Sequence, residues 1–211
     1  MLPAAAALAL AACNRARPAA VSEADRALGL RVGLSDSALT AIREIATGAL
    51  AELRPMDSLG NALPARGVSF ALPERQSLPA IARLRRRMGA GYLVFRAEQG
   101  FGHGPDSIAV MPGSDQFDAL RVRGTSGPNY NITTDSAIAL ARRWDAEFGL
   151  DIVGAGLDWF EARFRRTPTD FLALARLLYR VCPDVVDQGS GTVEGLAGDM
   201  RQSNTLYCWW D

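Results

Sequence analysis

Segments with strand character alternate with segments of helical periodicity along most of this chain, and this alternation constrains the fold more than any other feature. Short apolar or alternating runs predict strands at residues 68–72, 92–97, 108–111 and 205–210, and a very short one at 130–132. Residues 150–164 also have strand character, with an interruption at Gly154–Gly156 that predicts a bulge or a break. Strands separated by helices predict an α+β fold, with a mixed or antiparallel sheet and helices packed mainly on one face.

The helices between these strands are marked by their first and last residues. Ser35 is a candidate N-cap for a helical pattern that continues through Leu53 and stops at Pro55. The run Thr167–Asp170 has the composition of a helix start, and Pro183 ends the helix that follows it. Further helices are predicted at 78–88, 116–123, 134–148 and 192–200.

Length and composition indicate a globular domain of ordinary size with an extension. The chain has 211 residues, of which 48% are hydrophobic and 22% charged. It carries 23 basic and 23 acidic residues, a balance that does not predict binding to nucleic acid. His103 is the only histidine, which disfavours metal sites built from several histidines. The three cysteines, Cys13, Cys182 and Cys208, have no zinc-ribbon spacing, and whether Cys182 and Cys208 pair is left open.

The N-terminus carries an apolar run that ends at a cysteine. Residues 2–12 are almost entirely Ala and Leu, too short to span a bilayer but the right size for the apolar core of a signal peptide. The run ends Leu10-Ala11-Ala12-Cys13, which looks like the lipobox of bacterial lipoproteins, so we predict a signal at 1–13 and lipidation of Cys13. The expected partner is then the membrane, and the expected location is the cell envelope, facing the periplasm or the exterior. No Arg or Lys precedes the run, and the alternative is a cytoplasmic protein with an Ala-rich terminal segment.

The domain boundaries follow from composition. Residues 14–34 are rich in Ala and Arg, contain Pro18 and show no clear period, so we predict a tether. Residues 35–66 are expected to form an N-terminal helix and a loop, and residues 67–211 the α+β domain.

Four ordered motifs occur in the C-terminal part: 125–130 (TSGPNY), 156–161 (GLDWFE), 182–189 (CPDVVDQG) and the ending 209–211 (WWD). Through them, residues 67–211 resemble the bacterial domain of unknown function 4253 family, most specifically over 120–211. The chain departs from that pattern at Ser126 and Cys208. The resemblance implies no catalytic role, and the residues identify no cofactor and no metal site.

Polar residues in these motifs are the candidates for a shared binding cleft: Asn129, Tyr130, Asp158, Glu161, Asp184, Asp187, Gln188, Trp210 and Asp211. The loop after Cys182 joins carboxylates to a helix start, whose free N–H groups suit an anion. Asp158 and Glu161 are expected on opposite faces of a strand, with Glu161 pairing with Arg163. The alternative assigns each polar residue a separate role in capping a turn.

Three functions remain open at this point. The first is a binding or interaction domain displayed at the membrane, because no nucleophile motif or cofactor fingerprint is present. The second is a hydrolase or transferase that uses Asp158, Asp184 and Asp187, with or without a divalent cation. The third is an immunity-type protein. Carboxylates gathered in one cleft favour the enzyme, and dispersed carboxylates beside an apolar surface favour the binding domain.

Overall fold

A computed structural model describes residues 20–56 and 61–211 as an α+β domain built on a seven-stranded mixed sheet, which confirms the predicted class. The predicted signal, the lipidation site Cys13 and the first part of the predicted tether lie outside the described residues. Within the described part of the chain, no helix is both long and apolar enough to cross a membrane. The elements in chain order are α1 (Glu23–Val32), α2 (Asp36–Arg43), β1 (Ala51–Leu53), β2 (Gly67–Leu72), α3 (Glu74–Met88), β3 (Tyr92–Glu98), β4 (Asp106–Pro112), α4 (Asp118–Arg123), η1 (Pro128–Tyr130), α5 (Thr134–Phe148), β5 (Leu150–Ala155), β6 (Trp159–Phe164), α6 (Phe171–Tyr179), η2 (Val185–Ser190), α7 (Val193–Ser203) and β7 (Thr205–Trp209).

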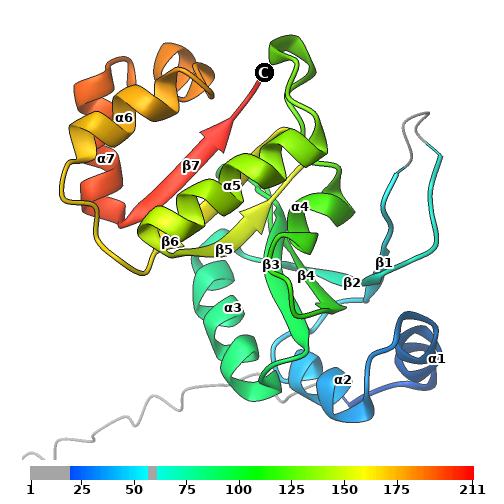
Figure 1. Cartoon of the computed structure of the whole chain (residues 1–211). Helices are drawn as coiled ribbons and strands as arrows, with labels where there is room; N and C mark the ends of the chain where they lie inside the picture. Colours follow the sequence, from blue (N-terminus) through cyan, green and yellow to red (C-terminus); the bar gives the residue numbers. More distant parts are fainter. Residues whose placement is uncertain (1–19, 57–60) are drawn as a thin grey trace, which may run out of the picture.

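The sheet has the strand order β1-β2-β4-β3-β5-β6-β7, shown in Figure 1. All neighbouring pairs are antiparallel except β3 and β5, which are parallel. The predicted interruption in 150–164 is a bulge between Ile152 and Gly154, followed by the turn between β5 and β6. Only β6 pairs with β7, so β7 forms one edge of the sheet.

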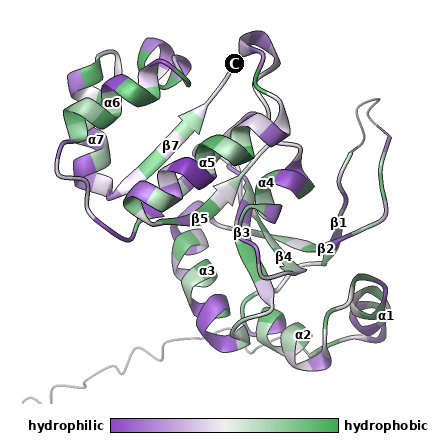
Figure 2. Cartoon of the chain, in the orientation of Figure 1, coloured by the Kyte–Doolittle hydropathy of each residue, from purple (hydrophilic) through white to green (hydrophobic). Residues whose placement is uncertain are grey.

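Helices cover both faces of the sheet, and the expectation of helices mainly on one face is wrong. One core cluster contains Phe95 of β3 and Met111 of β4, together with residues of α4, α5, α6 and α7. A second cluster contains their neighbours Val94 and Val110, together with residues of α1, α2 and α3. Because side chains alternate between the faces of a strand, these clusters lie on opposite sides of the sheet. The central strands β3 and β4 are accordingly coloured mainly hydrophobic in Figure 2.

The prediction of a tether at 14–34 is wrong from Glu23 onward, because α1 packs on the domain. Ser22 and Asp25 form a capping box at its start. Leu28 and Val32 are buried in the second cluster. The carboxylate of Asp25 accepts a hydrogen bond of 2.9 Å from Arg43 Nε of α2, and both side chains are buried. This hydrogen bond to Arg43 lowers the pKa of Asp25 to about 2.

Residues 35–66 also belong to the domain and do not form a separate helix and loop. Ser35 caps α2 as predicted, but the helix ends at Arg43. Ala51–Leu53 then forms β1, which pairs with β2 at the second edge of the sheet. Two smaller predictions need correction as well. In place of the short strand expected at 130–132, Pro128–Tyr130 forms a 3₁₀ turn and Ile132 makes only an isolated β-bridge to Gly127. Helix α6 is capped by Asp170, the last residue of the predicted start 167–170, and not by Thr167.

Candidate functional site

The four family-like motifs meet at the end of the sheet where β7 finishes. The side chain of Thr125 donates a 2.6 Å hydrogen bond to the carbonyl of Gly156, and Ser126 N donates to the carbonyl of Leu157. These contacts join the motif 125–130 to the turn between β5 and β6. The main-chain N–H of Trp210 donates to the carbonyl of Asp158, which joins the chain ending to the same turn.

Trp210 is the buried centre of this junction. Its side chain is 1% exposed, and its indole Nε1 donates a 2.7 Å hydrogen bond to the carbonyl of Val181. Gly127 lies directly against the indole, because a Cβ atom at this position would be 2.5 Å from Trp210 Cγ. The contact therefore requires glycine, which explains the Gly127 of the motif 125–130.

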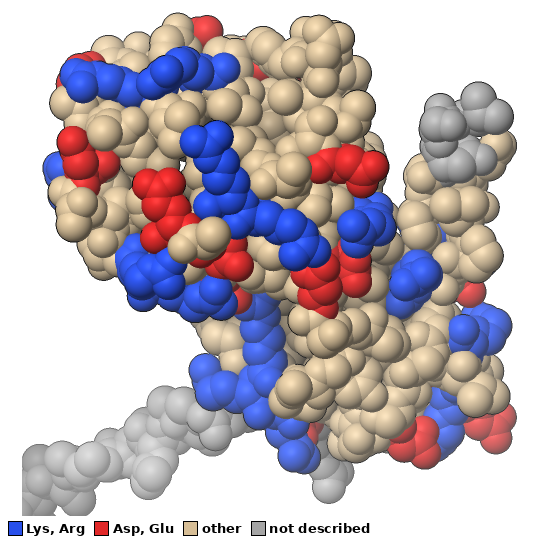
Figure 3. Space-filling view, viewed as in Figure 1, with Lys and Arg blue, Asp and Glu red and all other residues tan. Residues whose placement is uncertain are grey.

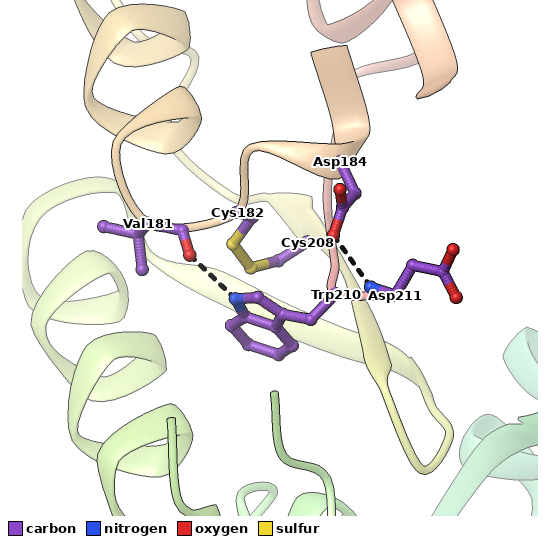
Figure 4. Close-up of a disulfide and its surroundings, with 6 residues drawn as sticks. All are labelled: Val181, Cys182, Asp184, Cys208, Trp210 and Asp211. Carbon is purple, nitrogen blue, oxygen red and sulfur yellow. Dashed lines mark hydrogen bonds between the residues drawn. A yellow bond between two sulfur atoms is a disulfide. The ribbon is translucent and has the colours of Figure 1, made fainter. Parts of the chain in front are cut away.

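A disulfide between Cys182 and Cys208 lies beside Trp210, as Figure 4 shows. Both cysteines are fully buried, and their Cα atoms are 5.6 Å apart. The bond connects the segment between α6 and η2 to β7. It answers the question that the cysteine spacing left open, and it explains why this chain has a cysteine directly before the paired tryptophans.

Five of the nine predicted cleft residues are joined by hydrogen bonds into one cluster, which we call the C-terminal clasp: Asn129, Tyr130, Asp184, Gln188 and Asp211. Asp184 is its centre. One carboxylate oxygen accepts from the Tyr130 hydroxyl at 2.9 Å and from Gln188 Nε2 at 3.1 Å, and the other accepts from Asp211 N at 2.8 Å. Asn129 Nδ2 donates to the main-chain oxygen of Asp211, and Gln188 also reaches the Asp211 carboxylate.

The clasp determines the ionisation of its members. Burial of Asp184 acts to raise its pKa, but the hydrogen bonds from Asp211 N, Tyr130 and Gln188 outweigh burial and leave the pKa lowered. The pKa of Tyr130 is raised, chiefly because its hydroxyl donates to the Asp184 carboxylate. Asp184 is therefore an anion held by three donors of its own chain.

The other predicted residues are placed differently. Trp210 lies next to the clasp, and Asp158 contributes its main-chain carbonyl there. Asp187 is exposed and accepts a 2.9 Å hydrogen bond from the Tyr179 hydroxyl, which raises the pKa of Tyr179. Glu161 lies in a separate network, where it forms an ion pair with Arg96 in place of the expected pair with Arg163.

That separate network is a group of buried polar residues that sequence reasoning missed. Arg96 of β3 pairs with Glu161 and, at 3.3 Å, with Asp106, and all three side chains are at least nine-tenths buried. The guanidinium carbon Cζ of Arg96 also lies 5.9 Å from the centroid of the Trp159 ring, and that ring stacks on Tyr207. The pKa of Tyr207 is raised, mainly because its hydroxyl is buried and secondly because the negative charge of Glu161 is nearby. The available signal was an arginine in the middle of an apolar strand, where charges are rare unless paired.

Five surface cavities in the described part of the chain are lined by residues outside the clasp. Within residues 20–56 and 61–211, no three His, Cys, Asp or Glu side chains are grouped as metal ligands. Acidic and basic side chains are interleaved over α4 and α5 (Figure 3), and several are paired, such as Arg142 with Asp115 and Arg165 with Asp145.

Comparison with known proteins gives one match. Residues 107–211 match the family described as domain of unknown function (DUF4253), which confirms the resemblance of the C-terminal part to that family. No curated protein and no solved structure is similar to the chain. All four motifs lie inside the matched range and converge on Trp210 and the clasp, so the matched segment includes the complete junction.

Proposed function

We propose that this chain is an exported bacterial lipoprotein, anchored at Cys13, whose α+β domain binds a partner molecule outside the cytoplasm. The observation that carries the proposal is the buried disulfide between Cys182 and Cys208. Structural disulfides persist in oxidising compartments such as the bacterial periplasm and are rare in the cytosol. The lipobox-like Leu10–Cys13 supports the same location from the other end of the chain.

The clasp argues against acid–base chemistry at the Asp184 carboxylate and so supports a binding domain. A general acid or base must reach the proton that it transfers, at about 3 Å from the substrate atom. Both oxygens of Asp184 already accept hydrogen bonds from the chain, and the residue is 4% exposed. The clasp thus fastens the end of β7 and η2 in place, which is a structural task.

The anchor is tested by labelling the full chain in a bacterial host with an alkyne fatty acid. We expect label on the wild type and on Cys182→Ser, and none on Cys13→Ser, because only the Cys13 thiol would accept the diacylglycerol. Protease added to spheroplasts should degrade the labelled protein. An unlabelled wild type, or a labelled Cys13→Ser variant, would contradict the proposed anchor.

A further inference from the structure

The free edge of β7 has main-chain groups that lack a partner. Hydrogen bonds to β6 are made by the even-numbered residues: Trp210 N donates to Asp158 O, and Asn204 O accepts from Phe164 N. In an antiparallel pair, the residues that alternate with the hydrogen-bonded ones direct their N–H and C=O groups away from the neighbouring strand. In β7 these are the odd-numbered residues. The groups of Tyr207 and Trp209 therefore point outward, and no partner for them is found in the described part of the chain.

A groove of about 300 Å³ follows this edge. Its strand side is formed by Thr205 together with Tyr207 and Trp209, the two residues whose main-chain groups point outward. Opposite them are apolar side chains of η2 and α7, including Val185, Leu196 and Met200. Figure 1 shows α6 and α7 beside β7 on this side. Asp199 is the only charged residue among those lining the groove.

The two edges of the sheet differ in their protection. Edge strands are usually protected against pairing with a strand of another chain, either by being short or by carrying charged residues. β1 has three residues, and Glu52 at its centre pairs with Arg31 and Arg54. β7 has the sequence Thr-Leu-Tyr-Cys-Trp, without a charged residue, and the disulfide and clasp hold it in place.

We propose that the β7 edge binds an extended segment of a partner polypeptide as an eighth strand of the sheet. The proposal rests on the proposed binding function and names the class of partner. An extended peptide is the ligand whose alternating N–H and C=O groups match those of Tyr207 and Trp209. One apolar side chain of the peptide would contact Leu196 and Met200, and a basic side chain would lie near Asp199, because that carboxylate is the only charge of the groove.

The test uses the full chain and a blocked heptapeptide in which lysine and valine alternate. Hydrogen exchange of single amides is measured with and without peptide. At a free concentration about ten times its Kd, the peptide should slow exchange at Tyr207 and Trp209 about tenfold and leave Leu206 and Cys208 unchanged. Asp199→Asn should weaken binding about threefold, whereas Glu194→Gln, on the same helix but outside the groove, should not.

Two N-methylated peptides provide the matched control. One is methylated on every valine nitrogen and the other on every lysine nitrogen. Because alternate amides of a strand point to opposite sides, only one of the two should lose binding. Equal binding of both, or unchanged exchange at Tyr207 and Trp209 in millimolar peptide, would overturn the proposal. A dimer that protects these amides without peptide would overturn it too, since a second copy would then occupy the edge. None of these outcomes affects the labelling of Cys13, so failure here is distinguishable from failure of the anchor.

Discussion

At the scale of single residues, Asp184 is the centre of the C-terminal clasp, which holds β7 and η2 together. Its carboxylate is buried and accepts three hydrogen bonds, from η1, η2 and the chain ending. Asp187, three positions later, is exposed and accepts one bond, from Tyr179. Two aspartates of one turn therefore differ in burial and in number of partners, which makes them a matched pair for substitution.

Asp184→Asn should lower the free energy of unfolding by about 2 kcal/mol, because the amide turns its NH₂ group toward a buried donor and loses an acceptor. Asp187→Asn should change it by less than about 0.5 kcal/mol. Urea unfolding at neutral pH measures both. Equal effects of the two substitutions would contradict the central position of Asp184.

The stability that the Asp184 carboxylate contributes should also depend on pH. The pKa of Asp184 is lower in the folded chain than in the unfolded chain. Its contribution to stability is therefore fully present above the unfolded pKa of about 3.9 and is lost as the pH falls through the lower folded value. The stability difference between wild type and Asp184→Asn should shrink below about pH 4.

The sequence predicted the residues of the clasp better than their role. Polar residues in separated turn motifs are expected to share a location, and Asn129, Tyr130, Asp184, Gln188 and Asp211 do lie together. The chain alone does not reveal that these residues bind one another. Glu161 was assigned to the same cleft because it belongs to the motif 156–161. Its actual partner, Arg96, lies on β3, and the pattern of one chain does not reveal which strands are neighbours in the sheet.

At the scale of elements, strands and capped helices were predictable, and the packing of α1 was not. The spacing in 23–32 is weakly amphipathic, since Leu28 and Val32 are its only large buried apolar side chains. Its position depends on Asp25, whose partner Arg43 belongs to the next helix. Composition rich in Ala and Arg suits both a tether and a helix, so tertiary contacts decide between them.

Removing α1 should therefore destabilise the domain. Deletion of residues 1–33 removes the burial of Leu28 and Val32 and leaves Arg43 without its buried partner, which should cost at least about 3 kcal/mol. Deletion of residues 1–19 retains every contact described above and serves as the control. Thermal unfolding followed by circular dichroism compares the two, and an equal Tm for both would show that α1 does not support the fold.

At the scale of the whole molecule, the sheet is covered on both faces, and its two edges differ in protection. The family match begins at Ser107, the second residue of β4, so the matched segment supplies nearly all of β4 together with β5, β6, β7 and the helices α4 to α7. The earlier residues add β1, β2, β3 and the second layer of helices. The disulfide lies in the matched half and holds the edge strand that we propose as a binding surface.

If the chain is exported to an oxidising compartment, Cys182 and Cys208 must be joined in the living cell, and their oxidation state can be measured there. Cells that produce the full chain are quenched with acid, free thiols are alkylated, and the digested protein is analysed by mass spectrometry without reduction. We expect a cross-linked pair of peptides containing Cys182 and Cys208, as for a chain exported to an oxidising compartment. Alkyl groups on both cysteines of the folded protein would contradict this expectation.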